Sequence, residues 1–189
     1  MIFGHDTESA LQAAVALANS AVGSDTLTTV RELDAWYAEH RYTGRRDRDA
    51  AELASVRALR PVLRDLLTAD REGAAGLVNT MLAEAHALPQ LVRHDDQDWH
   101  LHAVSSDAPL ATRVVVETAM AMTDVVRVDE LSRLSLCADQ GCRGIVLDLT
   151  RNRSRRYCST ACANRNAVAA YRARLGARQS SDGRSNRGA

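Results

Sequence analysis

Apolar residues return every three or four positions along most of the chain, which is the period of one face of a helix. Four such stretches precede the middle of the chain: 8–21, 29–40, 53–66 and 73–87. A fifth stretch, 108–128, carries apolar residues on several sides, as expected of a helix buried on much of its surface. The pattern therefore predicts a helical domain built around this fifth, central helix.

Two local signals refine the helix boundaries. Thr29 and Glu32 have the spacing of a capping box, so a helix should begin just after Thr29. Pro61 interrupts the third stripe, and an interior proline removes a backbone hydrogen bond at a cost of about 3 kcal/mol. We expect Pro61 either to kink the third helix or to start a second one.

A different pattern lies between Pro89 and Asp107. The runs LVRH and DWHLHAV alternate apolar and polar residues and are separated by DDQ, which predicts a β-hairpin. The 189 residues include only four Tyr, two Trp and one Phe, so the core must consist chiefly of Ala, Leu and Val, as in packed helices. We predict a mainly α fold (α+β), whose N-terminal helical domain carries this hairpin.

Targeting signals are weak. The first residues lack the positive segment of a signal peptide, and no stretch approaches the roughly 18 consecutive apolar residues of a membrane span. We expect a cytoplasmic protein that makes no membrane contact. Cysteines in that reducing compartment bind metal more readily than they form disulfides.

All four cysteines lie close together, with the spacing C-x4-C-x15-C-x3-C: Cys137, Cys142, Cys158 and Cys162. Two close pairs joined by a short insert suit a tetrahedral zinc site. The alternatives are four reduced buried thiols, or a redox or iron–sulfur site. Because four cysteines close the coordination sphere, we predict one Zn²⁺ that is structural and not catalytic.

The segment around the cysteines predicts a small treble-clef-like finger. GIVLDL and RRYC are expected to pair as a hairpin, and Ser159 or Thr160 to cap a final helix. On that helix the residues expected to face the core are Asn164, Val168, Tyr171 and Leu175.

Charge divides the chain although its formal net charge is zero. Residues 1–132 contain 12 Arg against 21 Asp plus Glu, and residues 133–189 contain 12 Arg against 3 Asp, so the balances are −9 and +9. We therefore predict a helical domain over 1–132, a zinc finger over 133–176, and a disordered basic tail over 177–189.

The basic half favours double-stranded DNA as a partner, because a positive face on a rigid zinc module suits phosphate contacts. The residues expected to contact DNA are Arg151, Arg153, Arg155, Arg156, Asn164, Arg165, Arg172 and Arg174. The alternative is that these arginines pair with the acidic half or dock another protein, which would make the chain an interaction adaptor.

The helical domain offers candidates for a ligand pocket: Asn19, Trp36, Trp99 and His100. The two tryptophans are interpreted as core or pocket walls, and His100 with His102 as an ordinary hairpin face unless they hold a ligand. The sequence has no G-x-S-x-G, H-E-x-x-H or G-x-G-x-x-G motif, and it has no lysine for a P-loop or Schiff base. We predict that the protein is not an enzyme.

Three stretches resemble one bacterial family over nearly the full chain: GHDTESALQAAVALANS, DWHLHAVSSDAPLATRVVVETAMAM and DLTRNRSRRYCSTACANRNAVAAYRAR. They resemble the CGNR zinc-finger proteins with an N-terminal ABATE domain, which are regarded as stress-induced transcription regulators. The motif that names the finger is here Cys162, Ala163, Asn164 and Arg165. The resemblance implies a zinc-dependent DNA-binding finger joined to a domain that senses a small-molecule effector.

Overall fold

The computed structural model describes residues 3–93 and 99–185, with side chains through residue 175. In chain order its elements are α1 (His5–Asn19), α2 (Val30–Glu39), α3 (Ala50–Thr68), α4 (Arg71–Glu84), β1 (Gln90–Val92), β2 (His100–His102), α5 (Leu110–Arg127), the 3-10 helix η1 (Leu131–Arg133), β3 (Leu134–Leu136), β4 (Ile145–Leu147) and α6 (Thr160–Ser185). The predicted mainly α fold with short β-hairpins is confirmed.

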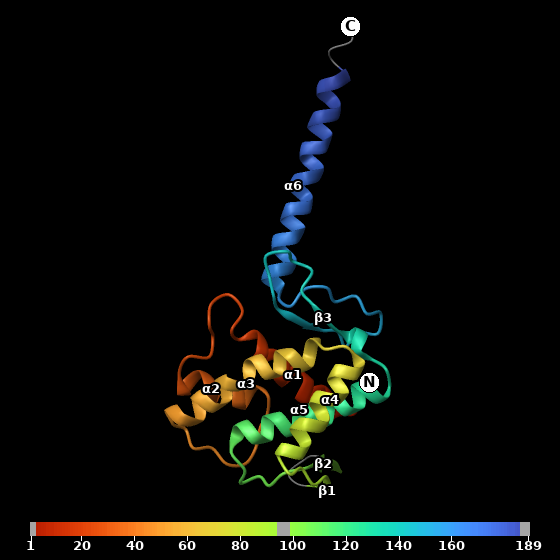
Figure 1. The fold of residues 1–189 in the computed structure, drawn as a ribbon. Coiled ribbons are helices and arrows are strands. Elements are labelled where there is room, and N and C mark those ends of the chain that lie inside the picture. Colours follow the sequence, from red (N-terminus) through yellow and green to blue (C-terminus); the bar gives the residue numbers. More distant parts are fainter. Residues whose placement is uncertain (1–2, 94–98, 186–189) are drawn as a thin grey trace.

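The helices α1 to α5 gather into one cluster, the β3–β4 hairpin lies against it, and α6 extends away from the rest of the molecule (Figure 1). The central position predicted for α5 is confirmed, because it packs against α1, α3 and α4. Leu110, Val114 and Met122 of α5 are at most 1% exposed. This cluster is the platform that carries the cysteine segment.

Helix α1 follows its predicted stripe but begins three residues before the predicted start at residue 8. Leu11, Val15 and Ala18 point into the core. Asp6 and Glu8 lie in the first turn, where a negative charge interacts favourably with the helix dipole. This favourable charge is consistent with the earlier start.

The capping box predicted for α2 is confirmed. The Thr29 hydroxyl accepts a hydrogen bond from the Glu32 amide at 3.2 Å, and the Glu32 carboxylate accepts one from the Thr29 amide at 2.9 Å. Both donors would otherwise be unsatisfied at the helix start, so these two side chains determine where α2 begins.

Helix α3 continues through Pro61, so the predicted alternative of a second helix starting there is wrong. Pro61 is on the exposed side of the helix, whereas Val56, Leu63 and Leu66 are completely buried. Burying each of these side chains contributes about 1.5–3 kcal/mol. Together they outweigh the ~3 kcal/mol cost of the interior proline.

The hairpin predicted after α4 is confirmed, since β1 pairs antiparallel with β2 and Leu91 lies opposite Leu101. The expectation that Trp99 is a core residue is wrong, because Trp99 is 63% exposed, and its suggested role as a pocket wall stays a prediction. In the described chain these two strands pair only with each other, and Leu91 is also 67% exposed. This face of the hairpin is uncovered, so its apolar side chains meet solvent.

Trp36 lies in an aromatic cluster beside α5. It is 7% exposed and stacks on Tyr42 with a ring-centroid distance of 5.1 Å. Next to this cluster, burial raises the pKa of Glu117 to about 7, and the nearby Arg113 and Tyr42 oppose the shift only in part.

Glu117→Gln is expected to remove a pH-dependent loss of stability. The folded protein keeps the Glu117 proton up to about pH 7, whereas the unfolded chain releases it near the ordinary value of 4.5, so this group makes the free energy of unfolding fall as the pH rises between these values. The free energy of unfolding of wild type should fall by about 2–3 kcal/mol more than that of the variant between pH 5 and pH 8, as measured by urea unfolding. The exposed Glu84→Gln is the control, and equal pH profiles for both variants would contradict the prediction.

Candidate metal centre and basic surface

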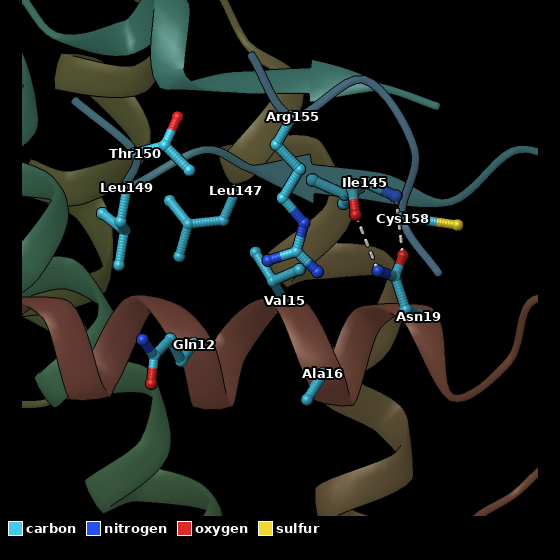
Figure 2. A pocket seen from close by; sticks show the side chains of 10 residues that line it. All are labelled: Gln12, Val15, Ala16, Asn19, Ile145, Leu147, Leu149, Thr150, Arg155 and Cys158. Carbon is cyan, nitrogen blue, oxygen red and sulfur yellow. Dashed lines mark hydrogen bonds between the residues drawn. The ribbon is translucent and has the colours of Figure 1, made fainter. Parts of the chain in front are cut away.

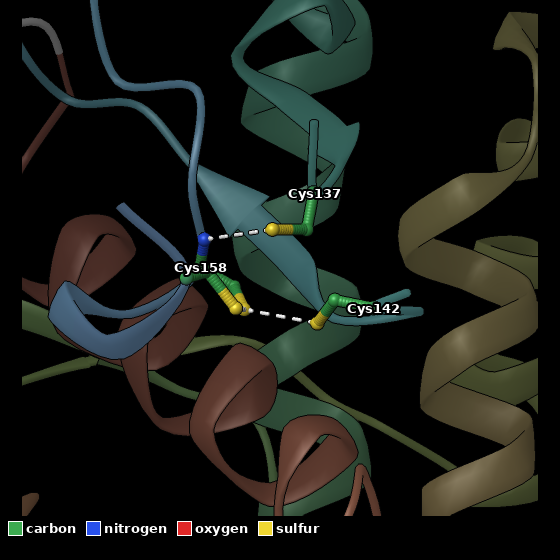
Figure 3. A group of neighbouring side chains, drawn as sticks. Cys137, Cys142 and Cys158 are labelled. Carbon is green, nitrogen blue, oxygen red and sulfur yellow. Dashed lines mark hydrogen bonds between the residues drawn. The ribbon is translucent and has the colours of Figure 1, made fainter. Parts of the chain in front are cut away.

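The four cysteines converge at the junction of the β3–β4 hairpin and α6. Cys137 and Cys142 lie in the connection between the two strands, Cys158 lies just before α6, and Cys162 is in its first turn. Their four sulfur atoms all lie within 4.8 Å of one another. The Cys142 and Cys158 sulfurs are 3.5 Å apart, and the Cys158 and Cys162 sulfurs are 3.8 Å apart. Figure 3 shows Cys137, Cys142 and Cys158 turned toward one another.

This geometry fits zinc. A tetrahedral site with Zn–S bonds of about 2.3 Å places its sulfurs roughly 3.8 Å apart. Backbone amides also point at the sulfurs, since Gly144 N donates to Cys142 at 3.3 Å and Cys158 N to Cys137 at 3.4 Å. Such hydrogen bonds favour the thiolate form that binds metal.

The charge balance of the cluster points to a cation as well. Burial and the neighbouring thiols raise the pKa of Cys158, because several thiolates in one small volume repel one another. A divalent cation removes this repulsion. The four cysteines are therefore the ligands of one structural zinc ion, and the closed ligand set leaves no position for a substrate.

Gly144 allows the two cysteine pairs to meet. A Cβ atom at this position would lie 2.5 Å from the Cys158 sulfur and 3.3 Å from that of Cys142. Only glycine permits this approach without moving a metal ligand.

Sequence reasoning missed a carboxylate that supports the cluster. Asp139 is buried, accepts a hydrogen bond from Gly141 N at 3.0 Å, and binds Arg165 Nε at 2.8 Å. The Arg165 guanidinium also donates to the Cys162 sulfur at 3.2 Å. The sequence feature that could have predicted this role is the Asp two residues after Cys137, because an Asp side chain often closes a tight loop by forming an Asx turn. Arg165 therefore has a partner within the finger, and its predicted DNA contact stays a prediction.

Arg165→Ala is expected to weaken zinc binding about tenfold, because groups that hydrogen-bond to metal ligands typically contribute 10- to 100-fold to affinity. Competition with a chromophoric chelator measures this. Arg172→Ala is the matched control, since Arg172 is exposed on the same helix and makes no contact with the cysteines. Unchanged zinc affinity in Arg165→Ala, together with weakened DNA binding, would make Arg165 a DNA contact and not a support of the metal site.

The hairpin predicted between GIVLDL and RRYC is wrong. Strand β4 pairs instead with β3, placing Leu134 opposite Leu147 and Leu136 opposite Ile145. The arginine-rich segment that follows has no regular structure because the buried Asp148 carboxylate holds it as a loop, accepting hydrogen bonds from Thr150 N at 2.9 Å and Arg155 N at 2.7 Å. Apolar burial decides the pairing, since β4 is buried along its length.

The core face predicted for the last helix is also wrong. Val168, Tyr171 and Leu175 are 47%, 57% and 40% exposed, and Asn164 is exposed as well. Helix α6 leaves the finger and extends away from the helical cluster, so no described element covers this face (Figure 1). It continues to Ser185, within the segment expected to be a disordered tail. Residues 186–189 of that tail lie outside the described part of the chain.

The arginines expected to contact DNA fall into two groups. Arg153 binds the Glu130 carboxylate at 2.8 Å and Ser132 Oγ at 2.8 Å, and Arg165 binds Asp139. Within the described chain, the others are exposed and their guanidinium groups have no hydrogen bond or ion pair: Arg151, Arg155, Arg156, Arg172 and Arg174. The second group forms the unpaired arginine set of the finger.

The four residues suggested for a ligand pocket are not brought together. Asn19 spans from α1 to β4, where its amide group donates to Ile145 O at 2.8 Å and accepts from Ile145 N at 2.7 Å. Trp36 lies in the aromatic cluster, whereas Trp99 and His100 belong to the hairpin, where the Nε2 atoms of His100 and His102 are 3.0 Å apart. Only Asn19 borders a cleft that also contacts the finger.

Fold and site define a helical domain joined to a four-cysteine zinc finger. Two family models match this arrangement: ABATE, described as "Putative stress-induced transcription regulator", at residues 11–129, and the CGNR zinc finger at residues 133–175. The chain belongs to the ABATE family and carries a CGNR zinc finger, as the resemblance implied. Neither model describes an enzyme family. A comparison with curated protein sequences found no match.

No helix in the described part of the chain combines the length and apolar character needed to cross a bilayer.

Proposed function

We propose that this protein is a zinc-dependent DNA-binding transcription regulator whose helical domain senses a small molecule. The observation that carries the proposal is the unpaired arginine set, five exposed guanidinium groups on a module that zinc holds together. Unpaired cations on a rigid scaffold bind DNA phosphates by displacing counterions. In this proposal the helical domain occupies residues 1–132 and the finger residues 133–176.

Helix α6 supports a DNA-facing role. It begins at Thr160, carries the zinc ligand Cys162 in its first turn, and extends away from the acidic helical domain (Figure 1). An α-helix fits the major groove of B-DNA, and Arg172 and Arg174 on this helix suit phosphate or guanine contacts. The acidic domain, with its balance of −9 over residues 1–132, is repelled by phosphate and so favours binding through the finger end.

The second candidate function is a protein-interaction adaptor, and one observation favours it. Val168, Tyr171 and Leu175 form an exposed apolar stripe on α6. Such a stripe suits docking of a helix from another protein, in a groove or as a helix pair. The flanking arginines would then select an acidic partner.

A salt titration separates the two candidates. Anisotropy measurements with a fluorescent random-sequence duplex at salt concentrations from about 50 to 200 mM should give a log Kd that rises linearly with log salt. A chelator should abolish the binding, because the finger depends on zinc. Absence of duplex binding at about 50 mM salt by zinc-loaded protein would overturn the DNA proposal and favour the adaptor.

A further inference from the structure

A cleft separates α1 from the finger (Figure 2). Its volume is about 540 Å³, which is within the usual 300–1,000 Å³ of small-molecule sites. The residues that line it are Gln12, Val15, Ala16, Asn19, Ile145, Leu147, Leu149, Thr150, Arg155 and Cys158. The walls are thus mostly apolar and come from both parts of the chain.

One charged side chain enters this cleft. In Figure 2 the Arg155 guanidinium reaches from the finger loop toward Val15 on α1. Its backbone is held in place, because Arg155 N donates to the buried Asp148 carboxylate at 2.7 Å. No carboxylate lines the cleft, and no hydrogen bond or ion pair joins the guanidinium to any described residue. An unpaired cation on an anchored stretch of backbone therefore faces a mostly apolar space.

The other polar groups of the cleft have different roles. Both ends of the Asn19 amide group are used by Ile145, so Asn19 connects the two walls and does not offer a binding group. The Thr150 hydroxyl donates to Asp148 at 2.5 Å. Gln12 is exposed at the rim on α1. Arg155 is thus the group that can pair with an anion, with Gln12 as an additional donor.

We propose that this cleft binds a small organic carboxylate with an apolar body. The carboxylate pairs with the Arg155 guanidinium, whose parallel N–H groups match two carboxylate oxygens, and the apolar body lies between Val15, Ala16 and Leu147. The apolar walls lower the local dielectric on one side of the ion pair and so strengthen it. This proposal rests on the proposed function, because it gives the sensing role a site and a ligand class.

The position of the cleft couples the ligand to DNA. Arg155 belongs to the unpaired arginine set, so a bound carboxylate competes with phosphate for the same guanidinium. Coupling between two binding equilibria is reciprocal. The ligand should therefore lower DNA affinity, and DNA should lower ligand affinity by the same factor.

Calorimetry with two probes of equal shape tests the site. Octanoate should bind saturably to zinc-loaded wild-type protein, and neutral octanamide at least about tenfold more weakly, because it lacks the charge-assisted hydrogen bonds. Three variants test the protein side of the site. Arg155→Gln should weaken octanoate binding about tenfold. Arg151→Gln removes an equal charge from the same loop outside the cleft and should leave octanoate affinity unchanged. Ala16→Trp should fill the cleft and also weaken binding, while zinc content and thermal melting report that each variant is folded.

Equal binding of octanoate and octanamide, equal effects of the two arginine variants, or no saturable binding of either octanoate or 2-naphthoate would overturn the inference. The DNA titration is independent of these results. Saturable octanoate binding without DNA binding would contradict the regulator proposal and support the cleft site. DNA binding without binding of octanoate or naphthoate would support DNA binding and contradict the cleft site.

Discussion

Removing zinc, or replacing Cys158 with serine, is expected to unfold the finger while α1 to α5 stay folded. The apolar cluster of the finger consists of Cys137, Val146 and Cys162, with Cys142, Tyr157 and Cys158 packed against it. Four of these six residues are the zinc ligands, so little apolar burial remains without the metal. Zinc binding contributes an apparent 10–16 kcal/mol in small zinc domains, which exceeds what such a core supplies.

Hydrogen exchange with and without a chelator measures this effect residue by residue. Amides from Cys137 to Gly144 and from Thr150 to Cys162 should lose protection. Ile145 and Leu147 belong to the main helical core, so β4 should lose less. Ser154→Ala, an exposed change in the same loop, is the control and should keep zinc and protection. Protected amides around Cys142 in metal-free protein would show that the finger folds without zinc.

Neutralising the unpaired arginine set is expected to have the largest effect on DNA binding. Arg172→Gln with Arg174→Gln should lower the magnitude of the salt slope by about 2, because each lost phosphate contact removes about 0.9. Adding Arg151→Gln and Arg156→Gln should lower it by about 2 more. Affinity should fall on every duplex sequence tested, since phosphate contacts carry no sequence information.

A charge-matched control excludes a general electrostatic effect. Arg31 and Arg127 are exposed on α2 and α5, in the helical domain. Replacing both by Gln removes the same charge as the Arg172 and Arg174 pair, and should leave the salt slope unchanged. Equal losses from the two double variants would mean that net charge, and not the finger surface, determines binding.

Competition between possible partners explains where the sequence-based prediction failed. RRYC and Leu134–Leu136 both lie near GIVLDL, and alternation alone does not say which one pairs with it. The buried Asp148 holds the arginine-rich segment as a loop, which leaves β3 as the partner of β4. Likewise, helical spacing marks Val168, Tyr171 and Leu175 as one face, but nothing local says whether another element covers that face.

By itself, the sequence determined the features that depend on neighbours in the chain. The capping box of α2, the stripe of α1 and the close spacing within each cysteine pair act over a few residues, so their physics can be recognised without the fold. Tertiary structure alone decided which arginines are neutralised. Arg153 and Arg165 find Glu130 and Asp139 only after the finger folds. The cleft beside Arg155 also depends on the tertiary structure. Its two walls lie more than a hundred residues apart in the sequence and meet through the Asn19–Ile145 hydrogen bonds.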